Sequence, residues 1–445
     1  MSYNYFTKPR EIFQSSNLLV LSTEIKVNAE TPISLFRKLC SNKKSYLLES
    51  AETVDKWGQY SYIGRNPFME VKSQGNKVYI YGENGIIRRK GRPLDIVKDL
   101  ISQYAMPSFG DMPDFIGGAV GYIGYDVIRS YEELKNINPD DIVIPDIHLL
   151  LMEELIIYDH PNEKIIIVIN LPVSPNIENA KEIALRKLRK IEEEVLDKNY
   201  ISEDKLVKEP RSFNYTSNES KDDFIKKVMK AKEYIKAGDI FQVVLSQRLQ
   251  VETDTDPFKV YKTLRNLNPS PYMFFIDYGE YHLVGSSPEM LCKVKEQMVE
   301  TCPIAGTRPR GKTPTEDSQL AQELLMDEKE LAEHLMLVDL ARNDVGKISK
   351  FGTVRLTNYM DIQKYSHVMH IVSNVAGTLS EDYDMFDSLI SCMPAGTVSG
   401  APKIRAMEII DELENNKRGV YAGAVGCIGF NGNMDTCIAI RTILF

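Results

Sequence analysis

The spacing of apolar residues predicts a chain that combines many strands with several helices. Over the first 200 residues the apolar runs are short and bounded by turn residues, which is typical of strands in a packed sheet. The glycine-flanked turn at 82–85 separates two such runs and predicts a hairpin. We expect strands at 45–50, 78–81, 86–88, 149–158 and 164–170, and amphipathic helices at 33–39 and 177–198.

Beyond residue 220 strands and helices alternate. Ser220 is placed to cap a helix that stops at Gly238. Its expected inward stripe consists of Phe224, Val228, Ala231 and Ile235. Residues 240–250 alternate as in one continuous strand, which places Gln242 on the face opposite Phe241. There it either lines a site or satisfies a backbone polar group. A further helix is expected from Pro402, and paired strands at 421–430 and 436–444.

The length of 445 residues exceeds what one small core needs and suggests two domains or one large composite domain. The stretch 199–222 is polar and weakly patterned, as linkers are. We therefore expect a division into residues 1–205 and 206–445.

The bulk composition is that of an ordinary globular protein, with 43% hydrophobic and 26% charged residues. The formal charge of −9 argues against nucleic acid as the main partner. Six widely separated cysteines fit reduced thiols better than a disulfide framework or a zinc site. The N-terminus lacks an apolar signal core and the apolar runs are too short to span a bilayer, so we expect a cytoplasmic protein without membrane contact.

One predicted helix carries the first candidate chemistry. Leu331, Leu335 and Val338 recur at helical spacing and form its expected buried stripe. Glu330 and Glu333 lie one turn apart on another face, where two carboxylates can bind one hard cation. Taken alone, such a pair is more often part of a solvated helix surface than a metal site.

Two loops are candidate anion sites. The prolines and glycines in 303–311 predict a shaped loop and not a regular element, and it is either a surface turn or an anion-binding loop beside the carboxylate helix. The loop 393–400 is rich in glycine and runs into a helix whose free backbone N–H groups and Lys403 suit an anion. The polar groups of the first loop are Thr307, Arg308 and Arg310.

Three long motifs carry a family resemblance. They are Pro-Ile-Ala-Gly-Thr-Arg-Pro-Arg-Gly at 303–311, Asp-Leu-Ala-Arg-Asn-Asp-Val-Gly at 339–346 and Pro-Ala-Gly-Thr-Val-Ser-Gly-Ala-Pro-Lys at 394–403. The chain resembles the chorismate-binding enzymes in these motifs, and most closely the large component of anthranilate synthase. The resemblance implies an α/β (α+β) fold, in which large packed antiparallel β-sheets are flanked by helices.

The resemblance also implies a role for individual residues. Glu330 and Glu333 match magnesium ligands, and Glu289 matches the general acid that helps the ring hydroxyl of chorismate to leave. His370 matches the histidine implicated in the later elimination step. The implied substrate-binding residues are Tyr421 and Arg441, which hold the enolpyruvyl carboxylate, and the pocket positions Thr307, Thr397 and Gly400.

Two positions separate the subfamilies by their chemistry. Relatives that add water place a lysine base where this chain has Gln242, and glutamine cannot deprotonate water, so ammonia is the expected nucleophile. The relative that makes aminodeoxychorismate places a lysine where this chain has Ala305, which cannot form a covalent intermediate. The resemblance therefore implies amination at ring carbon 2, loss of the carbon 4 hydroxyl and elimination of pyruvate to give anthranilate.

Two segments are similar to the tryptophan feedback site of the family. The alternative interpretation is an ordinary core strand followed by a turn. Since no nucleophilic cysteine stands between glycines with a partner histidine, ammonia is expected from a separate glutamine amidotransferase subunit. The implied feedback residues are Leu48, Glu49, Ser50, Asn268, Pro269, Ser270, Tyr272 and Met273.

The chain departs from the family pattern at its C-terminal end. The family continues past its final strand with a Gly-Ala-Gly turn and a helix that carries two more metal-binding glutamates, whereas this sequence ends at Phe445. We therefore expect residues 206–445 to form a truncated catalytic domain with weak or no activity. Two other interpretations stay open: aminodeoxychorismate synthase component I, and a catalytically impaired protein that binds tryptophan or docks an amidotransferase.

Overall fold

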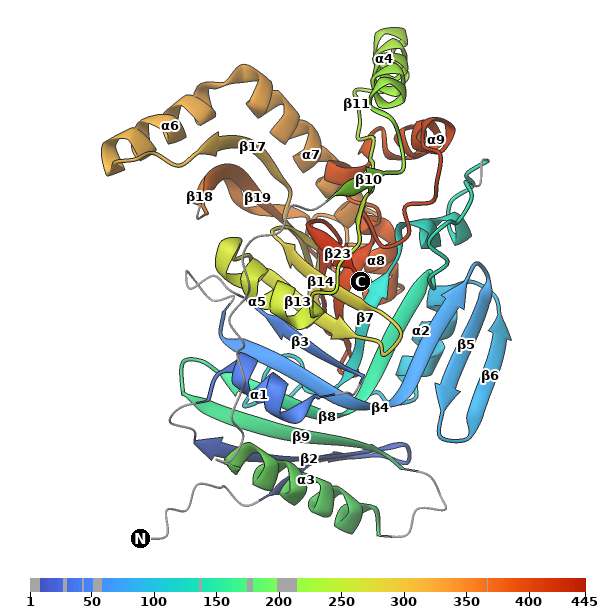
Figure 1. The fold of residues 1–445 in the computed structure, drawn as a ribbon, viewed down its shortest axis with the longest axis vertical. Helices are drawn as coiled ribbons and strands as arrows, with labels where there is room; N and C mark the ends of the chain where they lie inside the picture. Colours follow the sequence, from blue (N-terminus) through green and yellow to red (C-terminus); the bar gives the residue numbers. More distant parts are fainter. Residues whose placement is uncertain are drawn as a thin grey trace.

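The computed structural model describes residues 9–26, 30–41, 44–50, 58–135, 138–173, 179–197, 214–365 and 367–445. Its centre is one hydrogen-bonded network of 19 strands, and all of the pairings in it are antiparallel. Helices such as α1, α3 and α5 lie against its outer faces, whereas α4 projects away from it at the top of the view (Figure 1). This arrangement confirms the expected fold class, large antiparallel β-sheets flanked by helices.

The elements before residue 205 follow the predicted pattern. The Thr31 hydroxyl accepts a hydrogen bond from the backbone N–H of Ser34 and so caps the first helix. The strands are β1 (Arg10–Gln14), β2 (Leu18–Lys26), β3 (Ser45–Glu49), β4 (Tyr60–Gln74), β5 (Lys77–Gly82), β6 (Gly85–Lys90), β7 (Gly118–Ile123), β8 (Ile147–Asp159) and β9 (Lys164–Pro172). The helices are α1 (Pro32–Leu39), α2 (Pro93–Ser102), the short 3-10 helix η1 (Tyr125–Ser130) and α3 (Ala180–Leu196).

The later elements contribute most of the candidate site residues. The strands are β10 (Tyr215–Ser217), β11 (Gln242–Val243), β12 (Leu249–Val251), β13 (Tyr272–Asp277), β14 (His282–Ser287), β15 (Met290–Lys295), β16 (Met298–Thr301), β17 (Ile304–Pro309), β18 (Arg355–Lys364), β19 (Val368–Thr378), β20 (Gly400–Ala401), β21 (Ala424–Gly429), β22 (Met434–Ile438) and β23 (Thr442–Leu444). The helices are α4 (Lys221–Ala237), α5 (Pro257–Leu267), α6 (Pro314–Met326), α7 (Glu328–Gly346), α8 (Met385–Cys392), the 3-10 helix η2 (Gly396–Val398) and α9 (Lys403–Leu413).

Strands from both parts of the chain share the sheet. Strand β3 pairs with β13, and β7 pairs with β21 along its whole length. The predicted boundary at residue 205 lies outside the described residues. The division into 1–205 and 206–445 therefore stays a prediction, while the backbone hydrogen bonds join both parts into one layer.

The single strand predicted at 240–250 is wrong. Residues 242–243 form β11, which pairs with β20, and residues 249–251 form β12, which pairs with β10. Phe241 is 77% exposed and does not enter a core. The reason is a distant partner: the N–H groups of Phe241 and Val244 bind backbone carbonyls of the 399–401 segment, so residues 241–244 pair with that segment and do not continue into β12.

Two predicted helix stripes are also partly wrong. On α4 only Ala231 is buried, and Val228 and Ile235 are exposed. On α7 Leu335 is exposed, whereas His334 is fully buried and its Nε2 lies 2.7 Å from Ser373 Oγ. A polar side chain that is hydrogen-bonded at one of its atoms can occupy a core position that apolar periodicity assigns to a neighbour.

The loop predicted at 303–311 is instead a strand over most of its length. β17 pairs with β19, and the register shifts between Ala305 and Thr307. Gly306 sits at that shift with a φ of 67°, which is the left-handed region that glycine adopts without a steric penalty. The glycine therefore marks a β-bulge and not the end of regular structure.

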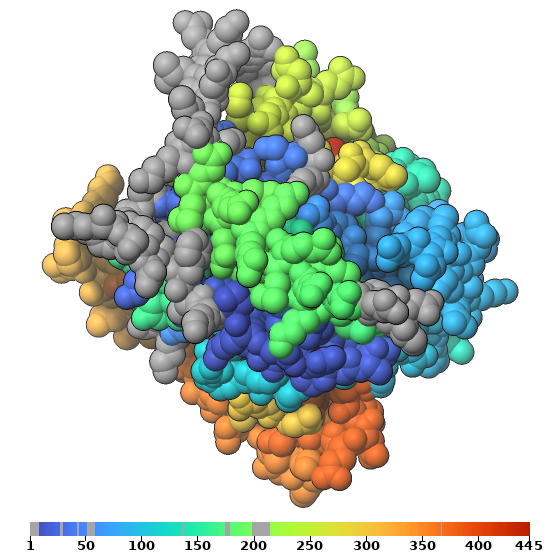
Figure 2. Space-filling model, turned by 90° about the horizontal axis from the view of Figure 1, so that it is seen from below, coloured from blue at the N-terminus to red at the C-terminus, as the bar shows by residue number. Residues whose placement is uncertain are grey.

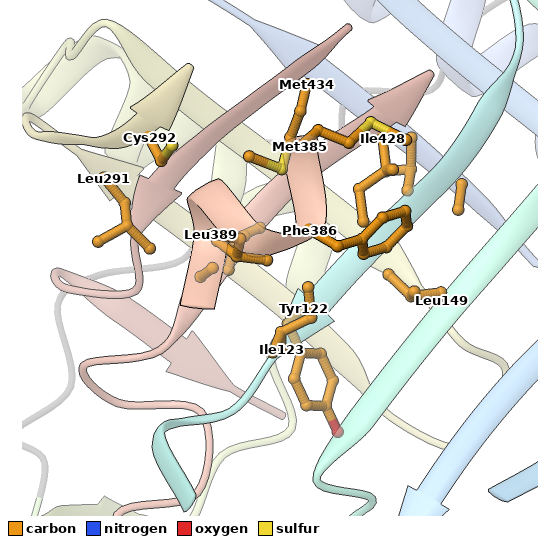
Figure 3. Packing of buried hydrophobic residues seen from close by; sticks show 14 of the residues in the cluster. Tyr122, Ile123, Leu149, Leu291, Cys292, Met385, Phe386, Leu389, Ile428 and Met434 are labelled. Atoms are coloured by element: carbon orange, nitrogen blue, oxygen red, sulfur yellow. The ribbon is translucent and has the colours of Figure 1, made fainter. Parts of the chain in front are cut away.

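The main core lies between α8 and the sheet. Phe386 and Leu389 of α8 point toward Tyr122 of β7 and Leu149 of β8, with Leu291 of β15 nearby (Figure 3). All five side chains are buried. This core is where strands from both parts of the chain meet.

A second core lies under α1, α3 and α5. Helix α3 crosses the outer face of the N-terminal strands, as Figure 2 shows in green over dark blue. Its buried residues pack on β2 and β9, and α1 and α5 add an aromatic cluster in which the Phe36 and Phe258 rings stack 4.8 Å apart. The α3 residues in this core are Ala184, Leu188, Ile191 and Val195.

Strand β6 is an edge of the sheet that pairs only with β5 among the described strands. All six of its residues are exposed, and Arg88, Arg89 and Lys90 follow Ile86 and Ile87. An edge strand with consecutive cations is a poor template for a second chain.

Replacement of Phe386 tests the α8 core. We expect Phe386→Ala to lower the free energy of unfolding by about 3–5 kcal/mol, because it removes a buried aromatic ring and leaves a cavity. Urea unfolding measures the change. The matched control is Phe351→Ala at a fully exposed phenylalanine, which we expect to alter stability by less than about 0.5 kcal/mol. Equal effects of the two variants would contradict the packing described here.

Candidate active site

Two glutamates of α7 open onto a cavity of about 290 Å³. Asp327 caps α7 by accepting hydrogen bonds from the N–H groups of Lys329 and Glu330, which fixes where the helix begins. Glu330 and Glu333 then follow on the turn that faces β17 across the cavity. The residues that line the cavity are Gln242, Ile304, Ala305, Gly306, Thr307, Glu330, Glu333, Leu337 and Thr397.

Gln242 lies directly beside the carboxylate pair. Its Nε2 donates a 2.9 Å hydrogen bond to Glu333 Oε1. Its Oε1 is buried and has no hydrogen-bond partner among the described residues. Gln242 thus lines the cavity, although the short strand β11 places it there and not the predicted continuous strand.

The oxygen atoms around Glu330 and Glu333 suit a hard cation. No group of three or more His, Cys, Asp or Glu side chains suited to a metal occurs in the part of the chain that the structure describes. Glu330 and Glu333 nevertheless share one cavity, and the unpartnered Gln242 Oε1 is close by as a neutral oxygen donor. Mg²⁺ prefers oxygen donors and keeps several waters, so these residues fit such an ion.

Glu289 is buried at the turn between β14 and β15. Burial raises the pKa of its carboxyl to about 8, because desolvation disfavours the charged form. The Thr397 hydroxyl, the backbone N–H of Ile304 and the charge of Arg441 oppose this shift. At neutral pH the carboxyl is therefore mostly protonated and can donate a proton.

His370 lies on β19 opposite Thr307 of β17. Its Nδ1 is 2.8 Å from the carbonyl oxygen of Gly306 and 3.1 Å from Thr307 Oγ1. Because a carbonyl only accepts, Nδ1 carries the proton and Nε2 keeps its lone pair. Burial lowers the pKa of the imidazole, and the charge of Arg441 lowers it further against the opposing Gly306 bond. His370 is thus a neutral imidazole that can accept a proton.

Arg441 interrupts what the sequence predicts as one strand over 436–444. The chain forms β22 and β23 instead, and Arg441 between them has a φ of 49°. Its guanidinium acts on the pKa values of both Glu289 and His370, so it lies near both groups.

Gly400 contributes through its backbone. A Cβ at this position would meet the carbonyl oxygen of Gln242 at 2.1 Å. Gly400 also has a φ of 137° and pairs with Val243 in the β11–β20 ladder. Among the predicted pocket residues, Thr307 and Thr397 line the cavity, while Gly400 lets the Gln242 segment approach.

The predicted anion-binding cations are all paired. Lys403 Nζ lies 2.7 Å from Asp344 Oδ2 and also binds the backbone carbonyls of the α8 C-terminus. Arg308 binds Asp327 at 2.7 Å and Arg310 binds Asp317 at 2.8 Å. The expectation of an anion held by these residues is not met; the three cations instead join helices and strands around the site.

A model of the family described as chorismate binding enzyme matches residues 43–445. The chain belongs to the chorismate-binding enzymes.

Similar members of this family share one name. Anthranilate synthase component 1 of Acetivibrio thermocellus is 50% identical and covers 100% of this chain and 91% of its own length. The protein of that name from Aquifex aeolicus is 46% identical and covers 98% of this chain and 89% of its own length. The crystal structure of anthranilate synthase component I from Streptococcus pneumoniae superposes with a TM-score of 0.78 at 38% identity, covering 94% of this chain and 92% of that one. These similarities confirm the resemblance seen in the three sequence motifs.

The two segments predicted as the feedback site lie side by side. Met273 of β13 pairs with Glu49 of β3. Glu49 is buried and accepts hydrogen bonds from Tyr261 at 2.5 Å and from Arg265 Nε at 3.1 Å, both on α5. The Ser286 hydroxyl is hydrogen-bonded to both Asn268 and Ser270. The Tyr272 hydroxyl donates to Asp435 at 2.9 Å. The Ser50 hydroxyl is buried without a partner among the described residues. Leu48 and Pro269 lie on the same two segments.

Sequence reasoning missed three residues of the site. Leu337 lines the cavity, and its position four residues after Glu333 on the same helix face could have indicated this. Asp327 caps α7 and holds Arg308; an aspartate just before a helical pattern is a recognisable cap. Arg418 lies three residues before Tyr421, and nothing in its sequence spacing indicates that it binds several segments around the cavity.

The buried carboxyl of Glu289 predicts a pH-dependent stability. Its folded-state pKa of about 8 lies above its ordinary value of 4.5, so the folded protein binds this proton more tightly than the unfolded chain. Its contribution to stability therefore falls as the pH rises from about 4.5 to 8. We expect Glu289→Gln to gain stability over the wild type as the pH rises through this range, measured by urea unfolding at pH 5, 6.5 and 8.

The control for this experiment is Glu323→Gln, at an exposed glutamate of α6. Its stability curve is expected to follow the wild type at each pH. A Glu289→Gln curve that also stays parallel to the wild type would mean that Glu289 is ionised in the folded protein at neutral pH.

Proposed function

We propose that this protein is the large component of an anthranilate synthase, which converts chorismate and ammonia to anthranilate, pyruvate and water. The observation that carries the proposal is the chemistry around the cavity: a protonated Glu289, a neutral His370 and Gln242 beside the Glu330–Glu333 pair. The residues described as lining the cavity include no lysine, and Gln242 and Ala305 occupy the two positions where lysine distinguishes other chorismate chemistries. The names of the relatives support the same activity.

Glu330 and Glu333 would hold Mg²⁺ in this proposal. When bound, the ion neutralises one substrate carboxylate, which two anionic glutamates would otherwise repel. Asp327 and Arg308 keep the first turn of α7 in place, with Arg308 Nη1 3.9 Å from Glu330 Oε1. Arg441 and the Tyr421 hydroxyl are the proposed partners of the enolpyruvyl carboxylate, because guanidinium geometry suits a carboxylate.

The chain's own residues move the protons. Glu289 donates its proton to the carbon 4 hydroxyl, which leaves as water while the nitrogen–carbon 2 bond forms. The unpartnered Oε1 of Gln242 accepts an N–H from ammonia and orients its lone pair. The new ammonium group returns one proton to Glu289, and His370 Nε2 accepts the proton of carbon 2. The bond to the enolpyruvyl oxygen then breaks, and the departing enolate takes up the proton from His370 to become pyruvate.

Ammonia is proposed to come from a glutamine amidotransferase partner, since relatives named component 1 imply a second component. Tryptophan is the proposed feedback inhibitor at the β3–β13 segments, whose polar groups meet at Glu49. We also propose a cytoplasmic location. No helix in the described part of the chain is long and apolar enough to cross a membrane.

The activity test is anthranilate fluorescence from chorismate, Mg²⁺ and ammonium without glutamine. The proposed function requires measurable turnover by the wild type, which also tests the weak or absent activity expected from the sequence, and a fall in kcat of about 10²–10⁴-fold in Glu289→Gln, since the general acid is lost. Formation of a non-aromatic aminated product would favour an aminodeoxychorismate synthase. Absence of chorismate binding and turnover would reject the proposal.

Removing one of the two carboxylates is expected to weaken Mg²⁺ binding more than it slows the chemical steps. Glu330→Gln and Glu333→Gln should each raise the Mg²⁺ concentration for half-maximal turnover by about tenfold or more, because each removes one charged ligand. Glu323→Gln on the neighbouring helix is the matched control. Binding of Mn²⁺ to the protein without substrate provides a readout independent of activity, and unchanged affinity in both variants would contradict the assignment.

A further inference from the structure

Arg418 is a buried cation that joins separate segments of the site. It lies after α9, and its side chain is only 2% exposed. Four hydrogen bonds hold the guanidinium: two to Glu414, one of 2.6 Å from Nη1 to the carbonyl of Val398, and one of 2.7 Å from Nη2 to the carbonyl of Val244. A guanidinium has donors in a fixed fork, so these partners fix one another's positions.

The two carbonyls belong to segments that carry candidate site residues. Val398 follows Thr397, which lines the cavity. Val244 lies two residues after Gln242, and its N–H binds the carbonyl of Ser399. The Arg418 side chain thus holds together the two backbone segments that contain β11 and β20.

The guanidinium also contacts two aromatic rings. It lies over the Tyr421 ring at 5.4 Å from the centroid and over the Tyr125 ring at 4.9 Å. Tyr421 is the proposed partner of the enolpyruvyl carboxylate, and Tyr125 belongs to η1 in the N-terminal part. Arg418 therefore contacts a third candidate substrate-binding residue, Tyr421, and also Tyr125 of the N-terminal part of the chain.

Glu414 neutralises the buried positive charge of Arg418. It forms a two-pronged ion pair with Arg418, and its Oε1 also accepts from the N–H and the hydroxyl of Ser246. With its charge paired and four of its N–H groups directed at acceptors, the guanidinium can stay buried at a fixed position. This is the arrangement expected of a rigid support.

We infer that Arg418 is a positioning residue for chorismate, which acts through Thr397, Gln242 and Tyr421 and does not touch the substrate. This inference rests on the proposed function, because those three residues are assigned there. A lysine at position 418 could pair with Glu414 but could not also reach both carbonyls in the guanidinium geometry. The substrate-binding segments would then shift relative to one another while the sheet stays paired.

The test compares Arg418→Lys with Arg65→Lys. Arg65 is equally buried and paired, but it binds Glu154, Glu194 and the carbonyl of Leu39 under α1 and α3. Both variants are expected to lower the melting temperature. Only Arg418→Lys should raise the KM for chorismate, by about tenfold or more, because small displacements of substrate-binding groups have large effects; Arg65→Lys should keep KM within about twofold.

Hydrogen exchange separates this inference from the proposed activity. In Arg418→Lys, backbone amides of 241–246 and 396–401 should exchange at least about tenfold faster, while those of β8 stay protected. If the wild type does not turn chorismate over, the proposed function fails, and the exchange pattern still decides whether Arg418 holds the two segments. An unchanged KM in an active Arg418→Lys protein, or faster exchange spread equally over β8 in both variants, would overturn the inference.

Discussion

Backbone pairing between strands far apart in the sequence is the constraint on which the site depends. The pairs β3–β13 and β7–β21 fix the later strands against the earlier ones. β13 leads through β14 to Glu289, and β21 leads through β22 to Arg441. The N–H of Ile438 donates to the carbonyl of Glu289, so the two routes meet at the residue proposed as the general acid. A slip of one residue in either pairing would turn these side chains to the other face.

The same low-dielectric pocket sets two different protonation states. Burial makes the charged form unfavourable for any group, so it keeps Glu289 protonated and His370 unprotonated. One is then ready to give a proton and the other to take one at the same pH. The cation of Arg441 acts on both, and it opposes the upward shift that burial gives the pKa of Glu289.

The sequence was sufficient for many of the elements, which depend on local signals, and its motifs were sufficient for the family; the roles of the individual site residues stay predictions. Capping at Ser220, the stop at Gly238 and the hairpin at 82–85 are local, and the three motifs are contiguous. The errors concern choices made by distant partners. Residues of the 240–250 stretch are hydrogen-bonded to the 399–401 segment. Lys403 forms an ion pair with Asp344. The bulge at Gly306 depends on the pairing of β17 with β19. Neither Arg418 nor the burial of Glu289 can be read from neighbouring residues.

The exposed β6 edge has a consequence for the behaviour of the protein at high concentration. Strand β6 forms one edge of the sheet, where unpaired backbone groups face water beside the exposed Ile86 and Ile87. The three cations that follow would meet the same charges on an approaching copy, and they would lose hydration in any shared ladder. Mutual repulsion at this single strand thus opposes fibre-like growth of the sheet from one molecule to the next.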